Sequence, residues 1–166
     1  DIKIWFNKYK NGDELPEGWQ MRPLSLQDIP ELKRLYSVYL SENVCGARIR
    51  PDGSSSWTEI SRVATGERAD DCFVLQSPDG HVSAYAWHGK GSWVPDGIER
   101  TTPSMLVVSE AIAESPEAAD ALLIGCDIWG REIARRESRE ITSIAYAVTE
   151  EGCLASALMR KDCEFR

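Results

Sequence analysis

The chain has 166 residues, of which 42% are hydrophobic and 28% are charged, a composition typical of one globular domain with a buried core. Its formal charge of −8 and its pI near 4.8 argue against partners that need a basic surface, so we expect no binding to nucleic acid or to membrane. No apolar run reaches the roughly 20 residues of a membrane span, and no signal-peptide pattern is present, which favours a cytoplasmic location.

Residues 1–18 differ from the rest of the chain. A short aromatic run over 2–9 is followed by Asn11-Gly12 and by Pro16-Glu17-Gly18, which are turn and linker residues. We expect residues 1–18 to be a tail or linker from a preceding domain, and residues 19–166 to be the folded domain, with truncation at its C-terminus left open. Because the chain begins at Asp1, we expect it to be a fragment of a longer protein.

The first half of the domain predicts a strand, two helices and a hairpin. A short strand over 19–23 precedes Ser25, which opens a helix with Asp28 at the capping-box position. A shorter helix is expected over 57–63. Two strands, 72–76 and 81–88, are joined by a turn rich in proline, aspartate and glycine.

The second half predicts a strand, a crossover helix and a parallel strand. The strand spans 105–112, and Ser115 and Pro116 mark the start of a helix that continues to about Arg136. The second strand spans 141–148, and Thr149 is expected to cap a last helix. Ligands tend to bind beyond the carboxyl ends of such strands, so we expect a site within 108–117.

The crossover helix has two different faces. Its buried stripe is predicted to contain Leu122, Cys126, Trp129 and Ile133, which recur at the helical period. Ile124 and Ile128 fall on the opposite side. They are either isolated surface residues or a strip that packs against another domain or subunit.

No metal site is predicted. The five cysteines are odd in number and not closely paired, which favours reduced thiols and excludes a zinc ribbon. His81 and His88 lack cysteine or carboxylate neighbours at the spacing of metal ligands.

The order of these elements resembles the GNAT superfamily of N-acetyltransferases. Residues 15–32, Leu-Pro-Glu-Gly-Trp-Gln-Met-Arg-Pro-Leu-Ser-Leu-Gln-Asp-Ile-Pro-Glu-Leu, resemble the opening of such domains, and residues 73–87 resemble their central hairpin. The resemblance implies an α/β fold: a mixed, mostly antiparallel sheet with a central parallel βαβ unit flanked by helices.

The resemblance also implies acetyl-CoA, with its pyrophosphate held by a glycine-rich loop at a helix start. The equivalent stretch here, 111–118, contains no glycine and no basic residue, and Glu114 and Glu117 put negative charge there. The chain therefore resembles the second, phosphate-loop-lacking half of tandem GNAT proteins of the enhanced-intracellular-survival type. Such a half implies an adjoining GNAT domain as partner; a homo-oligomer is the alternative.

Two side chains are candidates for catalysis in a GNAT-like enzyme. Glu110, expected to share a strand face with Leu106, Val108 and Ile112, would act as general base, unless it is exposed or paired with an arginine. Tyr146 would donate a proton to the leaving thiolate, unless it is an ordinary core tyrosine.

Three functions remain open at this point. The first is a structural or substrate-shaping half of an N-acetyltransferase that does not bind CoA. The second is a self-sufficient acetyltransferase with an atypical pyrophosphate site at Ser115, in which the backbone of Val107, Val108 and Ser109 holds the pantetheine. The third is a module that binds a small ligand or a protein.

Overall fold

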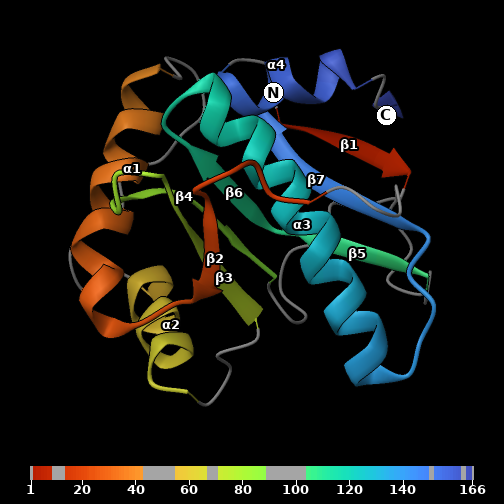
Figure 1. Cartoon of the computed structure of the whole chain (residues 1–166), viewed down its shortest axis with the longest axis horizontal. Coiled ribbons are helices and arrows are strands. Elements are labelled where there is room, and N and C mark those ends of the chain that lie inside the picture. The colour runs from red at the N-terminus through yellow and green to blue at the C-terminus, as the bar shows by residue number, and fades with distance from the viewer. Residues whose placement is uncertain are drawn as a thin grey trace.

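The computed structural model describes residues 2–8, 14–42, 55–66, 71–88, 104–149, 152–161 and 164–165. Its strands form two four-stranded sheets (Figure 1). The elements in chain order are β1 Ile2–Lys8, β2 Gln20–Pro23, a 3-10 turn Leu26–Asp28, α1 Ile29–Glu42, α2 Ser55–Ala64, β3 Cys72–Gln76, β4 Val82–Trp87, β5 Met105–Val108, β6 Glu110–Ala113, α3 Pro116–Glu137, β7 Ser143–Thr149, α4 Cys153–Arg160 and β8 Glu164–Phe165.

One sheet has the order β2-β3-β4-β6, and all its pairs are antiparallel. The other has the order β5-β7-β1-β8, in which β5 and β7 are parallel. The predicted strand, crossover helix and parallel strand are therefore confirmed as β5, α3 and β7. The predicted fold class, a mixed and mostly antiparallel α/β architecture with a central parallel unit, is confirmed as well.

The strand predicted over 105–112 is broken at Ser109. Before the break, Val108 is opposite Tyr146 of β7; after it, Glu110 is opposite Trp87 of β4. Because Ser109 interrupts the alternation, even-numbered side chains face one side of the sheet before the break and the other side after it. Leu106 and Val108 pack under α3, whereas Ile112 packs under α1 and α2. The prediction that Glu110 shares one face with Leu106 and Val108 was wrong for this reason.

Residues 2–8, where we expected a tail or linker, form a strand within the sheet. β1 pairs with β7 along its whole length, from Ile2 opposite Thr149 to Lys8 opposite Ser143, and Trp5 is opposite Phe165 of β8. The β-branched and aromatic residues of this run favour extended backbone, which is the physical basis of the difference. Residues 9–13, the next part of the predicted linker, lie outside the described residues.

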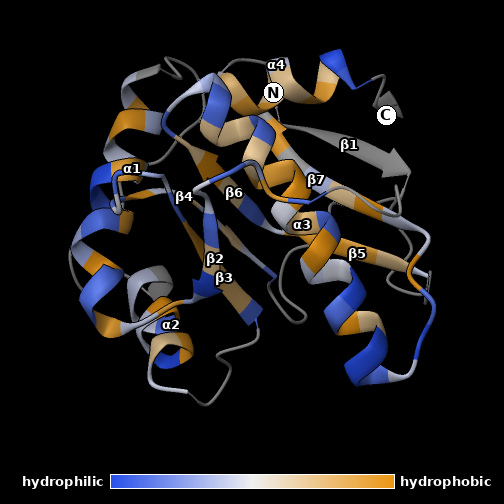
Figure 2. Ribbon diagram, in the orientation of Figure 1, coloured by the Kyte–Doolittle hydropathy of each residue, from blue (hydrophilic) through white to orange (hydrophobic). Residues whose placement is uncertain are grey.

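The core is divided by the sheets into two clusters. One lies under α3 and α4, and contains the predicted stripe of α3: Leu122, Cys126, Trp129 and Ile133 are each at most 3% exposed. The other joins α1 and α2 to the opposite side of β3, β4 and β6. Figure 2 shows the hydrophobic character of β5 and the hydrophilic C-terminal end of α3. None of the described helices combines the length and the apolar character that crossing a membrane requires.

Of the three helix starts predicted from capping residues, two are confirmed and one was wrong. At the turn before α1, the Ser25 amide donates to Asp28 Oδ2 at 2.8 Å, as the capping-box pattern predicted. The predicted cap of α3 is confirmed, since Ser115 Oγ accepts from the Ala118 amide at 3.1 Å. The predicted cap of the last helix was wrong: Thr149 is the last residue of β7, and α4 begins after Gly152.

Candidate functional site

The candidate site begins at the strand break, where β5 leaves one sheet and β6 joins the other. The Ser109 amide donates to the Trp87 carbonyl at 2.9 Å. His88 Nδ1 lies 2.8 Å from the carbonyl oxygen of Val107. Val108 is fully buried under α3. Of the three residues expected to offer backbone groups to pantetheine, two therefore already have a polar contact within the chain.

Glu110 follows the break directly and faces the side of α1 and α2. The hydroxyl of Tyr85, a fully buried residue of β4, donates to Glu110 Oε1 at 2.7 Å. Cys72 lies on the same face, opposite Trp87. Its burial, together with the negative charge of Glu110, raises the pKa of the Cys72 thiol. The half-buried carboxylate of Glu110 therefore accepts a short hydrogen bond from Tyr85 directly after the strand break.

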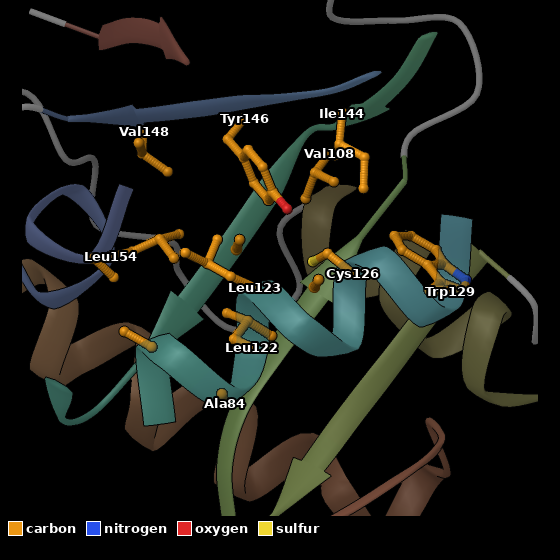
Figure 3. Close-up of a cluster of buried hydrophobic side chains, with 14 of the residues drawn as sticks. Ala84, Val108, Leu122, Leu123, Cys126, Trp129, Ile144, Tyr146, Val148 and Leu154 are labelled. Atoms are coloured by element: carbon orange, nitrogen blue, oxygen red, sulfur yellow. The ribbon is translucent and has the colours of Figure 1, made fainter. Parts of the chain in front are cut away.

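Tyr146 lies on the other side of the sheet from Glu110. It is fully buried under α3, with its ring directed toward Cys126 (Figure 3). Burial raises the pKa of the Cys126 thiol, and the hydrogen bond between Tyr146 and Cys126 acts in the opposite direction. The two side chains predicted as catalytic are consequently not brought together, and Tyr146 occupies the position of a core tyrosine.

Two amide groups at the start of α3 donate to Ser115. Ser115 Oγ accepts from the Ala118 amide, and the Ser115 carbonyl accepts from the Ala119 amide at 2.9 Å. Pro116 has no amide hydrogen to donate. An external anion at this helix start would therefore have to compete with the serine side chain.

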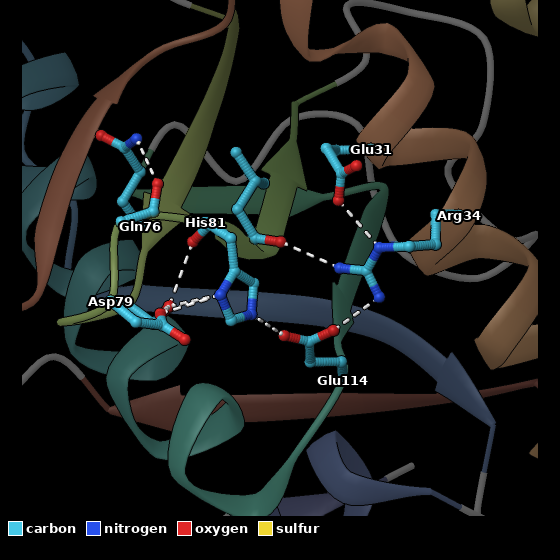
Figure 4. Close-up of polar contacts among 9 residues, drawn as sticks. Glu31, Arg34, Gln76, Asp79, His81 and Glu114 are labelled. Carbon is cyan, nitrogen blue, oxygen red and sulfur yellow. Dashed lines mark hydrogen bonds and ion pairs between the residues drawn. The ribbon is translucent and has the colours of Figure 1, made fainter.

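The loop before α3 carries a carboxylate that is itself held like a bound anion. Glu114 Oε2 accepts from Arg34 of α1 at 2.7 Å, and Glu114 Oε1 lies 2.7 Å from His81 Nε2 (Figure 4). The Glu114 amide donates to the Ser83 carbonyl at 3.1 Å, and the Ser83 side chain also hydrogen-bonds the carboxylate. We call these four residues, Arg34, His81, Ser83 and Glu114, the Glu114 clasp.

The contacts within the clasp lower the pKa of Glu114 and raise the pKa of His81, so both side chains are favoured in their charged forms. Partial burial alone would raise the pKa of Glu114, but the hydrogen bonds from Arg34, His81 and Ser83 outweigh it and lower that pKa. The hydrogen bond to Glu114 raises the pKa of His81, with a further contribution from Asp79 at 2.8 Å. Arg34 is also paired with Glu31 at 2.8 Å. The clasp therefore joins α1, the β3–β4 hairpin and the loop before α3.

The sequence indicated the charge of Glu114 but not its partners. Arg34 is 80 positions away along the chain, and His81 is 33 positions away. The sequence pattern around His81 bears only on metal binding and gives no sign of its contact with Glu114. Within the described ranges, no group of three or more histidine, cysteine, aspartate or glutamate side chains is arranged to hold a metal ion.

No protein-family model matches the sequence, and no curated protein matches it. Solved structures do match the fold. A protein of Thermus thermophilus superimposes with a TM-score of 0.52 at 17% identity, over 86% of each chain. The conserved protein of Enterococcus faecalis described as a probable N-acyltransferase gives a TM-score of 0.53 at 13% identity, over 99% of this chain and 37% of that one.

A tandem GNAT protein from the clavulanic acid biosynthesis pathway gives a TM-score of 0.52 at 10% identity, over 98% of this chain and 49% of that one. This chain thus spans most of the Thermus protein but less than half of the other two. At such identities the likeness establishes the fold alone.

Proposed function

Since the chain has the fold of the GNAT acetyltransferases, we propose that it is a domain of this fold that does not bind the pyrophosphate of CoA. It serves an N-acetyltransferase as a structural or substrate-shaping half, beside an adjoining GNAT domain. The length relation to the tandem GNAT protein supports this proposal, because this chain corresponds to 49% of that protein.

The supporting observation is the Glu114 clasp together with the start of α3. A pyrophosphate site in this fold needs donors at this helix start that point to an empty space. Here the carboxylate of Glu114 takes the hydrogen bonds of Arg34, His81 and Ser83. Ser115 takes the Ala118 amide, and Pro116 lacks a donor. The residues present do not fit the cofactor's pyrophosphate.

The same region also repels phosphate. Glu117 is exposed in the first turn of α3, and Asp120 follows one turn later with its carboxylate 2.9 Å from Arg160. Negative side chains at a helix start interact favourably with the helix dipole, so they occupy the electrostatic role that a phosphate would otherwise have. The carboxylate of Glu117 would therefore compete with an anion for the positive end of α3.

Calorimetric titration with acetyl-CoA tests the proposal. We expect no detectable heat from the native chain at micromolar concentrations, with an intact fold by circular dichroism. Glu117→Lys is the comparison for charge: if charge alone prevented binding, this variant would bind, whereas we expect no binding because the donors remain engaged. Micromolar binding by the native chain would overturn the proposal.

A self-sufficient acetyltransferase is the second candidate, favoured by the position of Glu110. At Ser109 the chain passes from the sheet that contains β7 to the sheet that contains β6, and the carboxylate of Glu110 lies directly after this break, hydrogen-bonded to Tyr85. If the native chain bound acetyl-CoA and acetylated amines, Glu110→Gln would be expected to lower the rate by about 100-fold or more, the contribution typical of a general base.

A further inference from the structure

His81 lies between two carboxylates, with one at each ring nitrogen. Its Nδ1 is 2.8 Å from Asp79 Oδ1 in the β3–β4 turn, and its Nε2 is 2.7 Å from Glu114 Oε1 (Figure 4). Because an ionised carboxylate only accepts hydrogen bonds, each contact requires a proton on the nitrogen concerned. The imidazolium form alone carries both protons, so the geometry is that of a charged His81.

The two carboxylates are held to different degrees. The Glu114 side chain is 20% exposed, and it also accepts hydrogen bonds from residues of α1 and β4. The Asp79 side chain is 67% exposed, and its contacts with Ser77 and His81 both lie within the turn. Asp79 is therefore the carboxylate that can move into solvent without disturbing other elements.

Ser77 supplies a second hydrogen-bond donor near His81. The Ser77 hydroxyl is in contact with Asp79 Oδ1, and it lies 3.4 Å from His81 Nδ1 and 3.1 Å from the His81 carbonyl oxygen. A hydroxyl carries one proton and rotates to suit its acceptor. In charged His81, Nδ1 is a donor, so the Ser77 proton goes to an oxygen. After Nδ1 has lost its proton, it is an acceptor that the Ser77 hydroxyl can reach.

We propose that His81 is a proton-operated switch in the β3–β4 turn. Its charged form holds both Asp79 and Glu114. When Nδ1 releases its proton to solvent, His81 keeps Glu114 through Nε2–H, releases Asp79 and accepts the Ser77 hydroxyl at Nδ1. Loss of the proton makes the turn more negative by one charge and exposes the carboxylate of Asp79.

The charged groups that face this switch come from three parts of the fold. Asp79 lies in the turn, Glu114 lies before α3, and Arg34 and Glu31 lie on α1, beyond Glu114. The pKa values of Asp79 and Glu114 are lowered and that of Arg34 is raised, so these three groups keep their charges near neutral pH. The pKa of His81 is raised, mainly by its hydrogen bond to Glu114, so the switch operates above the ordinary value of about 6.5.

The switch does not rest on the proposed function, because it requires neither CoA nor an adjoining domain. Acetyl-CoA binding by the native chain would leave it intact, and its failure would leave the proposed function intact.

Titration of the histidine rings by NMR tests the proposal. The chain has two histidines, so a His88→Asn variant identifies the signals of His81. Asp79→Asn should lower the pKa of His81, because the contact at Nδ1 loses its negative charge. Asp120→Asn is the matched control: this exposed aspartate is paired with Arg160 at 2.9 Å, and its loss should leave the His81 titration unchanged. If Asp79→Asn left the titration unchanged, the proposal would be overturned.

The nitrogen chemical shifts of the ring distinguish the two neutral tautomers. Above its pKa, His81 of the native chain should carry its proton on Nε2. Ser77→Ala should increase the fraction that carries it on Nδ1, because the hydroxyl that donates to Nδ1 is removed. Ser37→Ala, at an exposed position of α1, should leave that fraction as it is. A native chain that is mainly protonated on Nδ1, or a fraction that Ser77→Ala does not change, would show that Ser77 and Asp79 do not exchange at His81.

Discussion

At the scale of single residues, the most informative side chain is Glu114. Its carboxylate is only partly buried, yet hydrogen bonds from Arg34, His81 and Ser83 converge on it. In a helix-start anion site, such hydrogen-bond donors would be available to a ligand. In this chain the donors bind Glu114, and these contacts hold three separate elements together.

The His81 contact predicts a pH dependence of stability. The pKa of His81 is raised in the folded chain, mainly by its hydrogen bond to Glu114. The stabilisation is therefore fully present below the unfolded pKa of about 6.5 and is lost as the pH rises through the higher, folded value. Arg34 stays charged throughout, and Asp79 and Glu114 are ionised over this range. Because the His81 side chain is 48% exposed, we expect a loss of only a few tenths of a kcal/mol between about pH 6 and pH 8.

Urea unfolding at several pH values in low salt measures this effect. His81→Asn should remove the dependence, whereas His88→Asn, which leaves the clasp in place, should keep it. On the acid side the sign is opposite, because the pKa of Glu114 is lowered: its contribution is lost as the pH falls through that lowered pKa. A stability that does not change between pH 6 and pH 8 would show that the His81 contact contributes nothing.

At the scale of elements, the sequence predicted most of what local signals determine. The helical stripe of α3, its serine cap and the parallel pairing of β5 with β7 all follow from periodicity and capping residues. The break at Ser109 could not be predicted, because a continuous apolar run is compatible with either sheet partner. The Glu114 clasp could not be predicted either, since its partners come from α1 and from the hairpin, far away in the sequence.

Gly125 shows how packing overrides helix propensity in α3. A Cβ at this position would lie 3.1 Å from Phe73 Cε2 and 3.3 Å from Leu75 Cδ1. Alanine improves helix propensity by roughly 1 kcal/mol, but overpacking a core typically costs about 1–3 kcal/mol. We expect Gly125→Ala to lower the free energy of unfolding by about 1 kcal/mol in chemical denaturation. Ser37→Ala, on the exposed side of α1, is the control and should be neutral or slightly stabilising. A more stable Gly125→Ala variant would mean that Phe73 moves aside without cost.

At the scale of the whole molecule, the first described strand completes a sheet made otherwise from the second half of the chain. β1 lies between β7 and β8, so β7 has a partner on each side only while β1 is present. Without β1, both neighbouring strands would expose unpaired backbone groups along an edge. The segment resembling a linker in composition is thus essential to the architecture of this sheet.

Truncation tests this role. A variant that lacks residues 1–8 should lose its cooperative thermal transition or aggregate, as measured by circular dichroism and size-exclusion chromatography. A variant that lacks residues 162–166 removes only β8, which has two paired residues, and should stay folded. If the variant without residues 1–8 melted at the same temperature as the intact chain, β1 would be dispensable.

The position of β1 also affects how the chain folds during synthesis. Ile2 pairs with Thr149, so β1 leaves the ribosome long before its partner strand exists. At roughly 5–20 residues per second, this interval is on the order of ten seconds. During this interval the β1 segment, which contains aromatic residues, has no partner strand for its backbone hydrogen bonds. Contacts between residues so far apart in the sequence also form slowly. Residues 2–8 of nascent chains would therefore be available for binding by chaperones. Once the sheet has formed, this segment is paired with β7 and is no longer available.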